Sequence, residues 1–289
     1  MGKDVGTYMK KLGIIASFVF LCVNANAQYA ELGFTLGTSY YIGDLNPYTH
    51  YPKNTHIAGG VVFRYSFNKR YTMKLNLLYG QLEASDANSS SEVQLQRNLS
   101  FRSSLLEFGA TLEVNFFEYE IGDDKHWITP YMFAGLAYYR FNPQAKIDDS
   151  WFDLQPLGTE GQGTSARPGS EFYSLNQVSI PFGIGLKVSP SDRIGLAIEW
   201  GYRRTYTDYL DDVSGTYVDS DVLAFENGPL SAELADRSIS PDGEPLDNTN
   251  AQRGDSNTRD WYIYSGVMLT YKLGSKFQQC DRLIKGMGR

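Results

Sequence analysis

Eight stretches of this chain alternate apolar residues with polar or very small ones, which is the two-residue period of a β-strand with two unlike faces. The clearest runs from Leu106 to Phe116, where leucine, phenylalanine and valine alternate with glutamate, glycine and threonine. The eight stretches lie near residues 31–41, 56–67, 71–80, 106–116, 127–141, 178–187, 194–203 and 261–273. The pattern therefore predicts an all-β protein.

The second face of these strands has an unusual composition. It is dominated by glycine, small hydroxyls and isolated charges of both signs, whereas the first face is aliphatic and aromatic. An apolar face of this size would aggregate in water, but it suits contact with acyl chains, where only a closed barrel satisfies every backbone group. We therefore expect an eight-stranded antiparallel transmembrane β-barrel with a lumen filled by side chains. The alternative is a periplasmic β-sandwich or a lipocalin-like barrel.

Charges on the inner face are expected to pair inside this lumen. The predicted lumen charge network consists of Glu31, Arg64, Lys74, Glu107, Glu113, Lys187, Glu199 and Arg203. The stretch 127–141 is apolar on both faces, so its orientation is ambiguous. Our interpretation places Arg140 in the lumen and directs four aromatic residues toward lipid, namely Tyr131, Phe133, Tyr139 and Phe141.

The connections between the strands alternate in length. Short turns follow the second and sixth stretches, about ten residues follow the fourth, and the long connections cover roughly 43–54, 83–98, 144–176 and 207–257. Short periplasmic turns and long extracellular loops are typical of outer-membrane barrels. Aromatic residues near the strand ends are expected to form two interfacial girdles. These are Tyr40, Tyr79, Tyr139 and Trp261 on the extracellular side, and Tyr65, Tyr71, Phe116, Trp127 and Tyr271 on the periplasmic side.

The first residues have the three parts of a secretory signal peptide. Lysines come first, residues 12–23 form an apolar segment, and Ala25-Asn26-Ala27 is a small-residue cleavage site. We therefore expect export to the outer membrane of a Gram-negative cell. The expected division of the chain is a signal peptide at 1–27, an outer-membrane barrel at 28–273 and a periplasmic C-terminal tail at 274–289.

The composition restricts the possible partners and chemistry. The net charge of −7 argues against a nucleic-acid partner, which would require a concentrated basic face. The histidines lack a nucleophile motif, so we expect no enzyme, although His50 with Asp44 could be imagined in a lipid-modifying site. No cofactor and no metal are expected. The aspartates between Asp208 and Asp221 are more typical of a solvated loop than of a calcium site, and we interpret residues 158–164 as a flexible loop.

Several segments carry a resemblance to a known family. They are SYYIGDLNP at 39–47, PYMFAGLAYYRFNP at 130–143, QPLGTEGQG at 155–163, IPFGIGLK at 180–187 and, most specifically, RTYTDYLDDVSGTY at 204–217. Asp260-Trp261-Tyr262 and the late Cys280 also match. Together these segments resemble the PorG-type outer-membrane barrels of the type IX secretion system, over essentially the whole mature chain.

The resemblance implies a non-enzymatic role in protein secretion. Barrels of that family associate with a periplasmic ring made of a lipoprotein and its partner protein, near the large translocon barrel. By analogy this barrel would anchor or position the ring in contact with outer-membrane lipid. The tail supplies a hypothetical partner-binding site that consists of Lys276, Cys280, Arg282 and Lys285. A general structural or adhesive surface barrel is the alternative function, and a lipid-modifying enzyme is the least favoured one.

Overall fold

The computed structural model describes residues 29–47, 54–238, 240 and 246–274. Its elements in chain order are β1 (Tyr29–Ile42), β2 (His56–Ser66), β3 (Tyr71–Ser85), α2 (Glu92–Arg97), β4 (Ser100–Asn115), β5 (Ile128–Ile147), β6 (Ser150–Asp153), β7 (Asn176–Val188), β8 (Ile194–Thr205), α3 (Ser220–Glu226), α4 (Pro229–Ala235) and β9 (Trp261–Leu273). The helices are at most seven residues long, and none in the described part of the chain is long and apolar enough to cross a membrane.

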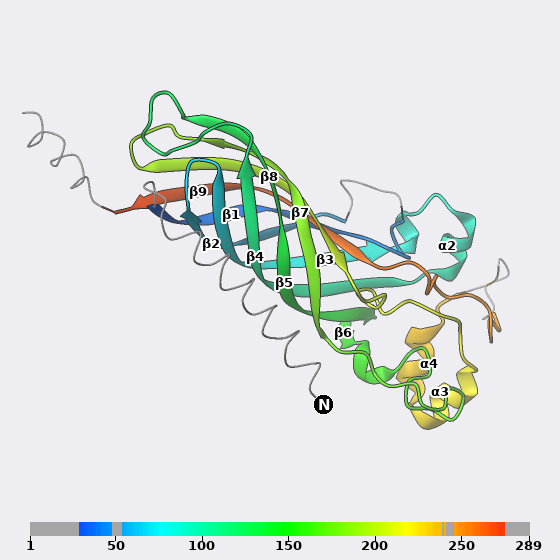
Figure 1. Cartoon of the computed structure of the whole chain (residues 1–289). Helices are drawn as coiled ribbons and strands as arrows, with labels where there is room; N and C mark the ends of the chain where they lie inside the picture. The colour runs from blue at the N-terminus through cyan, green and yellow to red at the C-terminus, as the bar shows by residue number, and fades with distance from the viewer. Residues whose placement is uncertain (1–28, 48–53, 239, 241–245, 275–289) are drawn as a thin grey trace, which may run out of the picture.

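Eight of the strands form a closed antiparallel ring (Figure 1). The order β4-β3-β2-β1-β9-β8-β7-β5 is completed by pairing of β4 with β5, so neither edge of the sheet is left open. The short β6 pairs only with the end of β5 and extends it as a hairpin beyond the ring. The predicted all-β, eight-stranded antiparallel barrel is therefore confirmed.

The register of the strands fixes the width of the barrel. Following partner positions around the ring leads through Ala30, Tyr65, Met73, Leu112, Ala134, Phe182, Tyr202, Ile263 and Tyr40. The path starts at residue 30 and returns to the same strand at residue 40, which gives a shear of ten residues for eight strands. Such a barrel has strands tilted by about 40° and an interior that side chains can fill.

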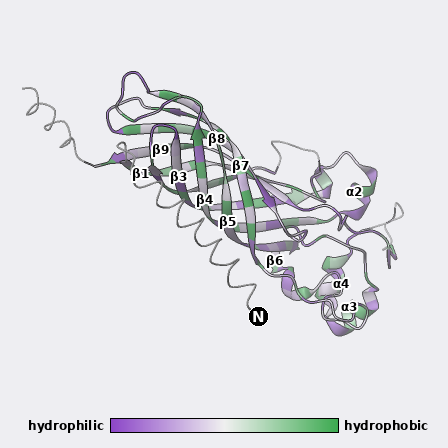
Figure 2. Cartoon of the chain, viewed as in Figure 1, coloured by the Kyte–Doolittle hydropathy of each residue, from purple (hydrophilic) through white to green (hydrophobic). Residues whose placement is uncertain are grey.

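The outer wall is apolar over the middle of the barrel. Outward residues of every strand in the ring are exposed there, and Figure 2 shows their alternation with polar residues along the strands. Examples are Phe34 at 70% exposure, Leu136 at 68% and Ile198 at 59%. An exposed belt of this size is not tolerated in water, whereas acyl chains would cover it. The structure is thus that of a membrane-spanning β-barrel.

The two ends of the barrel differ. The strand ends Tyr29 and Leu273 lie at one end together with the short connections, and we name this the turn end (Figure 1). The helices α2, α3 and α4 lie at the opposite end, which we name the loop end. Both ends of the described barrel therefore lie on the same side of the membrane.

The predicted orientation of β5 is wrong. Tyr131, Phe133, Tyr139 and Phe141 are at most 3% exposed and point inward, whereas Arg140 is exposed on the outer wall. The lumen accepts the rings of Tyr131 and Phe133 because their pairing partners on the neighbouring strand β7 are Gly185 and Gly183. A β-carbon added at Gly185 would lie 2.5 Å from atoms of the Tyr131 ring, so the glycine provides the space that the aromatic ring fills.

Two residues of the expected girdle are buried. Tyr40 was expected to face lipid, but it is 2% exposed and pairs across β1 and β9 with Ile263, which is 0% exposed. Tyr139 faces the lumen and does not belong to the girdle. Tyr79 at 61%, Tyr71 at 47% and Trp127 at 46% are exposed as expected.

Candidate functional site: the filled lumen and the loop cap

The middle of the lumen contains a continuous network of buried ion pairs. Four glutamates face two arginines and two lysines, so the formal charges cancel, and every member is at most 3% exposed. The members are Glu31, Arg64, Lys74, Glu107, Glu113, Lys187, Glu199 and Arg203. All eight residues of the predicted lumen charge network thus lie together inside the barrel.

Glu113 is the centre of one half of this network. Its carboxylate lies 2.6 Å from Nζ of Lys187, 3.1 Å from Nε of Arg64 and 3.7 Å from Nζ of Lys74. Arg64 also approaches Glu31 at 3.9 Å. The four residues of this half, Arg64, Lys74, Glu113 and Lys187, come from four different strands, namely β2, β3, β4 and β7. The ion pairs therefore join strands from separate parts of the sequence.

The other half of the network is centred on Glu199 and Arg203. Lys74 pairs with Glu199 and thereby links the two halves. Nε of Arg203 lies 3.2 Å from Glu107, and its NH2 group lies 3.9 Å from Glu199. Tyr131 adds a second link, because its hydroxyl donates to Glu199 at 3.1 Å. Burial of isolated charges would be very costly, so this mutual pairing is what allows the lumen to be both polar and dry.

The turn end of the lumen is closed by the connection between β4 and β5. Tyr119 and Ile121 from this connection pack with Tyr29 and are 3% and 1% exposed. Lys272 donates from Nζ to the Ile121 carbonyl at 2.8 Å, and the Tyr119 amide donates to the Lys69 carbonyl at 3.0 Å. A connection that the sequence described only as a turn of about ten residues therefore inserts into the barrel.

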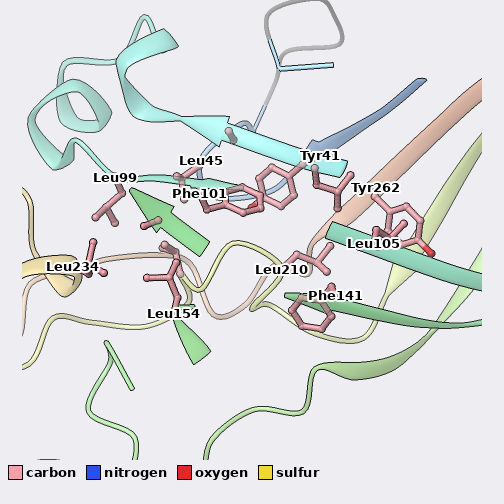
Figure 3. Packing of buried hydrophobic residues seen from close by; sticks show 14 of the residues in the cluster. Tyr41, Leu45, Leu99, Phe101, Leu105, Phe141, Leu154, Leu210, Leu234 and Tyr262 are labelled. Atoms are coloured by element: carbon pink, nitrogen blue, oxygen red, sulfur yellow. The ribbon is translucent and has the colours of Figure 1, made fainter. Parts of the chain in front are cut away.

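The loop end is closed by an apolar core that we call the loop cap core. It consists of buried residues from the strand ends and from the long loops (Figure 3). Leu210 and Val213 come from the last loop, Leu234 comes from α4, and all three are at most 1% exposed. They pack with Tyr41, Leu45, Leu82, Ala84, Leu99, Phe101, Leu105, Tyr139, Phe141, Ala145, Leu154 and Tyr262.

A polar latch fastens this cap, which we name the Glu160 latch. The Glu160 carboxylate accepts hydrogen bonds from the amides of Ser214 at 2.8 Å and Gly215 at 3.0 Å, and it pairs with Arg253 at 3.1 Å. Arg253 and Glu160 are 3% and 2% exposed. All residues of the segment 158–164 except Gly163 are therefore buried, and its interpretation as a flexible loop was wrong. This burial could not be predicted, because turn residues alone do not reveal what packs on them.

Burial also corrects the interpretation of the aspartates in the last loop. Asp208, Asp211 and Asp212 are at most 3% exposed, although a solvated loop was expected. Asp219 instead caps α3 by accepting from the Asp221 amide at 2.8 Å. Burial raises the pKa of Asp212 to about 6 and that of Asp208 to about 7. Neither carboxylate oxygen of Asp208 accepts a hydrogen bond of good geometry from a described residue.

The contacts of Tyr41 indicate that one of two neighbouring buried carboxyl groups is protonated. Its hydroxyl lies 2.5 Å from Asp211 and 2.9 Å from Asp260. One hydroxyl hydrogen can be donated to only one of the two carboxyl groups, so the other must carry a proton in order to form its hydrogen bond. Burial raises the pKa of both carboxyl groups well above the ordinary value, in agreement with this arrangement.

The remaining candidate residues do not form a site among the described residues. The predicted tail site, Lys276, Cys280, Arg282 and Lys285, lies outside the described residues, as does His50. The Asp44 carboxylate accepts from the Asp255 amide at 3.1 Å. His126 pairs with Asp123 at 2.8 Å at the turn end. Among the described residues, no three His, Cys, Asp or Glu side chains are arranged to hold a metal ion.

The closed ring, the apolar outer wall and the polar, filled interior together define a β-barrel of the outer-membrane type. The chain belongs to the family described as a domain of unknown function (DUF6089), whose model matches residues 10–154. A comparison with curated proteins found no match.

Several solved structures resemble the chain at low sequence identity. Neisserial surface protein A is 8% identical with a TM-score of 0.40, covering 86% of this chain and 100% of its own. OprG of Pseudomonas aeruginosa is 9% identical with a TM-score of 0.38, over 87% and 98% of the two chains. The attachment invasion locus protein Ail of Yersinia pestis is 9% identical with a TM-score of 0.37, over 85% and 97%.

Proposed function

We propose that this protein is a non-enzymatic outer-membrane component of the type IX protein secretion machinery that anchors or positions the periplasmic ring complex. The observation that supports a scaffold best is the closure of the lumen along its whole length. The network around Glu113 fills the middle, Tyr119 and Ile121 fill the turn end, and the loop cap core fills the loop end. A barrel closed in this way is suited to holding other proteins and not to conducting them.

The choice of secretion machinery rests on the resemblance of the sequence to PorG-type barrels. Two of its motifs, QPLGTEGQG and RTYTDYLDDVSGTY, contact each other in the loop cap. Thr159 donates to Asp212 at 2.5 Å, and the Ser214 amide donates to Glu160 at 2.8 Å. These segments therefore build one structural unit, which gives a physical reason for their joint presence. The proposed partners are outer-membrane lipid, the ring lipoprotein, its partner ring protein and, as a further candidate, the large translocon barrel.

Affinity purification from detergent-solubilised outer membrane tests the proposal. The full chain with a tag inserted in a loop is captured, and the retained proteins are identified by mass spectrometry. We expect both ring proteins at comparable amounts, whereas an unrelated small barrel with the same tag should retain neither. Recovery of the barrel from the outer-membrane fraction without ring proteins would refute the secretion role and leave the fold intact.

The C-terminal tail provides a sharper test. We propose that Cys280 and the neighbouring basic residues Lys276, Arg282 and Lys285 contact the ring lipoprotein at the periplasmic face. Non-reducing gels of cells that carry Cys280→Ser should lose a crosslinked band, and a charge-reversed tail should lose the ring proteins in the purification. An unchanged band pattern and an intact ring would exclude this contact.

A second candidate is a general structural or adhesive surface barrel. It is favoured by apolar side chains exposed on the loop-end helices, with Phe225 on α3 at 90% and Val93 on α2 at 74% exposure. If this reading is correct, cells with Phe225→Ser and Val93→Ser should adhere less to surfaces while secretion remains normal. The secretion role predicts the reverse result for a strain that lacks the protein.

A further inference from the structure

Basic side chains of the strands divide into two groups according to the face they occupy. In the lumen, Arg64, Lys74, Lys187 and Arg203 all pair with glutamate. On the outer wall, the described strands carry Arg102, Arg140, Lys146 and Arg204. These four lie on β4, β5 and β8, on one side of the ring. The outer group is not explained by the filling of the lumen.

Two members of the outer group are already bound within the protein. The Arg102 guanidinium lies 3.6 Å from the centroid of the Trp151 ring and donates to Gln144 at 3.3 Å. Lys146 pairs with Asp149 at 3.0 Å. The outward Asp153 of β6 is likewise occupied, because Asn142 and Gln144 donate to it.

Arg140 and Arg204 have no such partner. Both side chains are exposed, and neither side chain forms a hydrogen bond, ion pair or ring contact with another described residue. Arg140 follows Tyr138 on the outer face of β5, and Arg204 follows Tyr202 on that of β8. Both arginines therefore lie where the apolar belt ends toward the loop end, and tyrosine and tryptophan usually mark the lipid headgroups at this level.

The register places the two arginines at nearly the same height on the wall. Arg140 pairs with Asn176 and Arg204 with Ile180, so they differ by four residues along β7. With a shear of ten over eight strands, each step climbs 10/8 residues, so two steps offset 2.5 of the four residues in height. Over the sheet surface, four residues along the strand correspond to about 13 Å and two strand spacings to about 10 Å, so the two Cα atoms lie about 16 Å apart.

We propose that Arg140 and Arg204 form a binding site for the phosphate groups of an anionic lipid in the membrane leaflet at the loop end. A guanidinium group is planar, permanently charged and matched to phosphate oxygens. Two unpaired positive charges at headgroup level complement two phosphates of one phosphorylated glycolipid. The inference goes beyond the scaffold role and does not depend on it, because it uses only the outer wall of the barrel.

Lipid titration of the full mature barrel in detergent, followed by native mass spectrometry, tests this site. The probe is diphosphoryl lipid A, and the variants are R140Q/R204Q and the matched control R102Q/K146Q. The control removes the same charge from the same wall but at positions already bound within the protein. Each basic group near a lipid headgroup contributes about 1 kcal/mol, so loss of both should weaken binding about thirtyfold. The control should change it by less than about threefold.

The source of the phosphate is distinguished by two further probes. Lipid A from which both phosphates have been removed should bind the wild type about as weakly as R140Q/R204Q binds the intact lipid. Inorganic phosphate alone should not compete at millimolar concentration, because it lacks acyl chains that contact the belt. Heat-modified migration on gels verifies that each variant is folded. Equal binding of intact lipid by R140Q/R204Q and wild type, equal losses in the control, or full binding of the dephosphorylated lipid would overturn the proposal.

Discussion

Replacement of Glu113 by glutamine tests the reasoning about the lumen most directly. The change keeps the size of the side chain but removes the negative charge that faces Lys187 at 2.6 Å, Arg64 at 3.1 Å and Lys74 at 3.7 Å. Glu113 is fully buried, so water cannot replace the lost partner. Breaking a buried ion pair by removal of one member destabilises a protein by about 3–5 kcal/mol. We expect a loss in this range for Glu113→Gln.

The assay is urea unfolding of the barrel in lipid vesicles, followed by tryptophan fluorescence. A double variant, Glu113→Gln with Lys187→Met, restores equal numbers of positive and negative groups in the network. It should therefore recover at least half of the lost free energy of unfolding. The control is Glu83→Gln, because Glu83 is 38% exposed and its ion-pair partner among the described residues is His56, at 3.0 Å. An exposed pair contributes less than about 1 kcal/mol.

The reasoning fails if Glu113→Gln unfolds at the same urea concentration as the wild type. It also fails if the double variant is less stable than the single one, because charge balance would then not be the stabilising principle. A large loss for Glu83→Gln would point to a general sensitivity of the barrel and not to the network around Glu113.

Three further changes probe other parts of the structure. Burial raises the pKa of Asp208 to about 7, so the folded cap binds this proton more tightly than the unfolded chain does, and the cap should lose stability as the pH rises from about 4 to 7. The loss is measured as a decline in the hydrogen-exchange protection of residues 207–217, corrected for intrinsic rates. Asp208→Asn should abolish this decline, and a decline that persists in the variant would contradict the assignment. Gly185→Val would place a β-carbon 2.5 Å from the Tyr131 ring and 2.5 Å from the Ile198 carbonyl oxygen, so overpacking should cost about 1–3 kcal/mol in urea unfolding. Unchanged stability would contradict this account of the packing. Arg253→Met leaves the Glu160 carboxylate of the latch without its cation, so the cap should become sensitive to limited proteolysis while the barrel remains folded. Protease resistance equal to that of the wild type would show that the latch contributes little to the stability of the cap.

The alternation of residues was sufficient to predict the ring of strands and the lumen charges. In β4, each glutamate is flanked by apolar residues on both sides, so only one orientation buries the charge and exposes the leucines. In β5 both faces are apolar, and the pattern carries no such information. The orientation of β5 is decided by space beside it in the lumen, where glycines of the adjacent strand β7 leave room for the rings of Tyr131 and Phe133.

The loop cap could not be predicted from periodicity. Its contacts join residues such as Glu160 and Arg253 that are 93 positions apart, and neither belongs to a strand or a helix. Local composition in these loops, with several aspartates and glycines, suggests solvent exposure. Burial of Asp211 and Asp212 becomes possible only because a tyrosine hydroxyl and Arg253 meet them from other segments, which no local pattern records.

The closed lumen also constrains how the molecule can be assembled. The segment between β8 and β9 comprises residues 206–260 and includes two helices, and it ends on the side opposite to the strand ends Tyr29 and Leu273. Once β1 and β9 have joined, the ion pairs leave no passage wide enough for such a segment. It must therefore be translocated while the seam between the first and last strands is still open, so seam closure has to be the final step of membrane insertion.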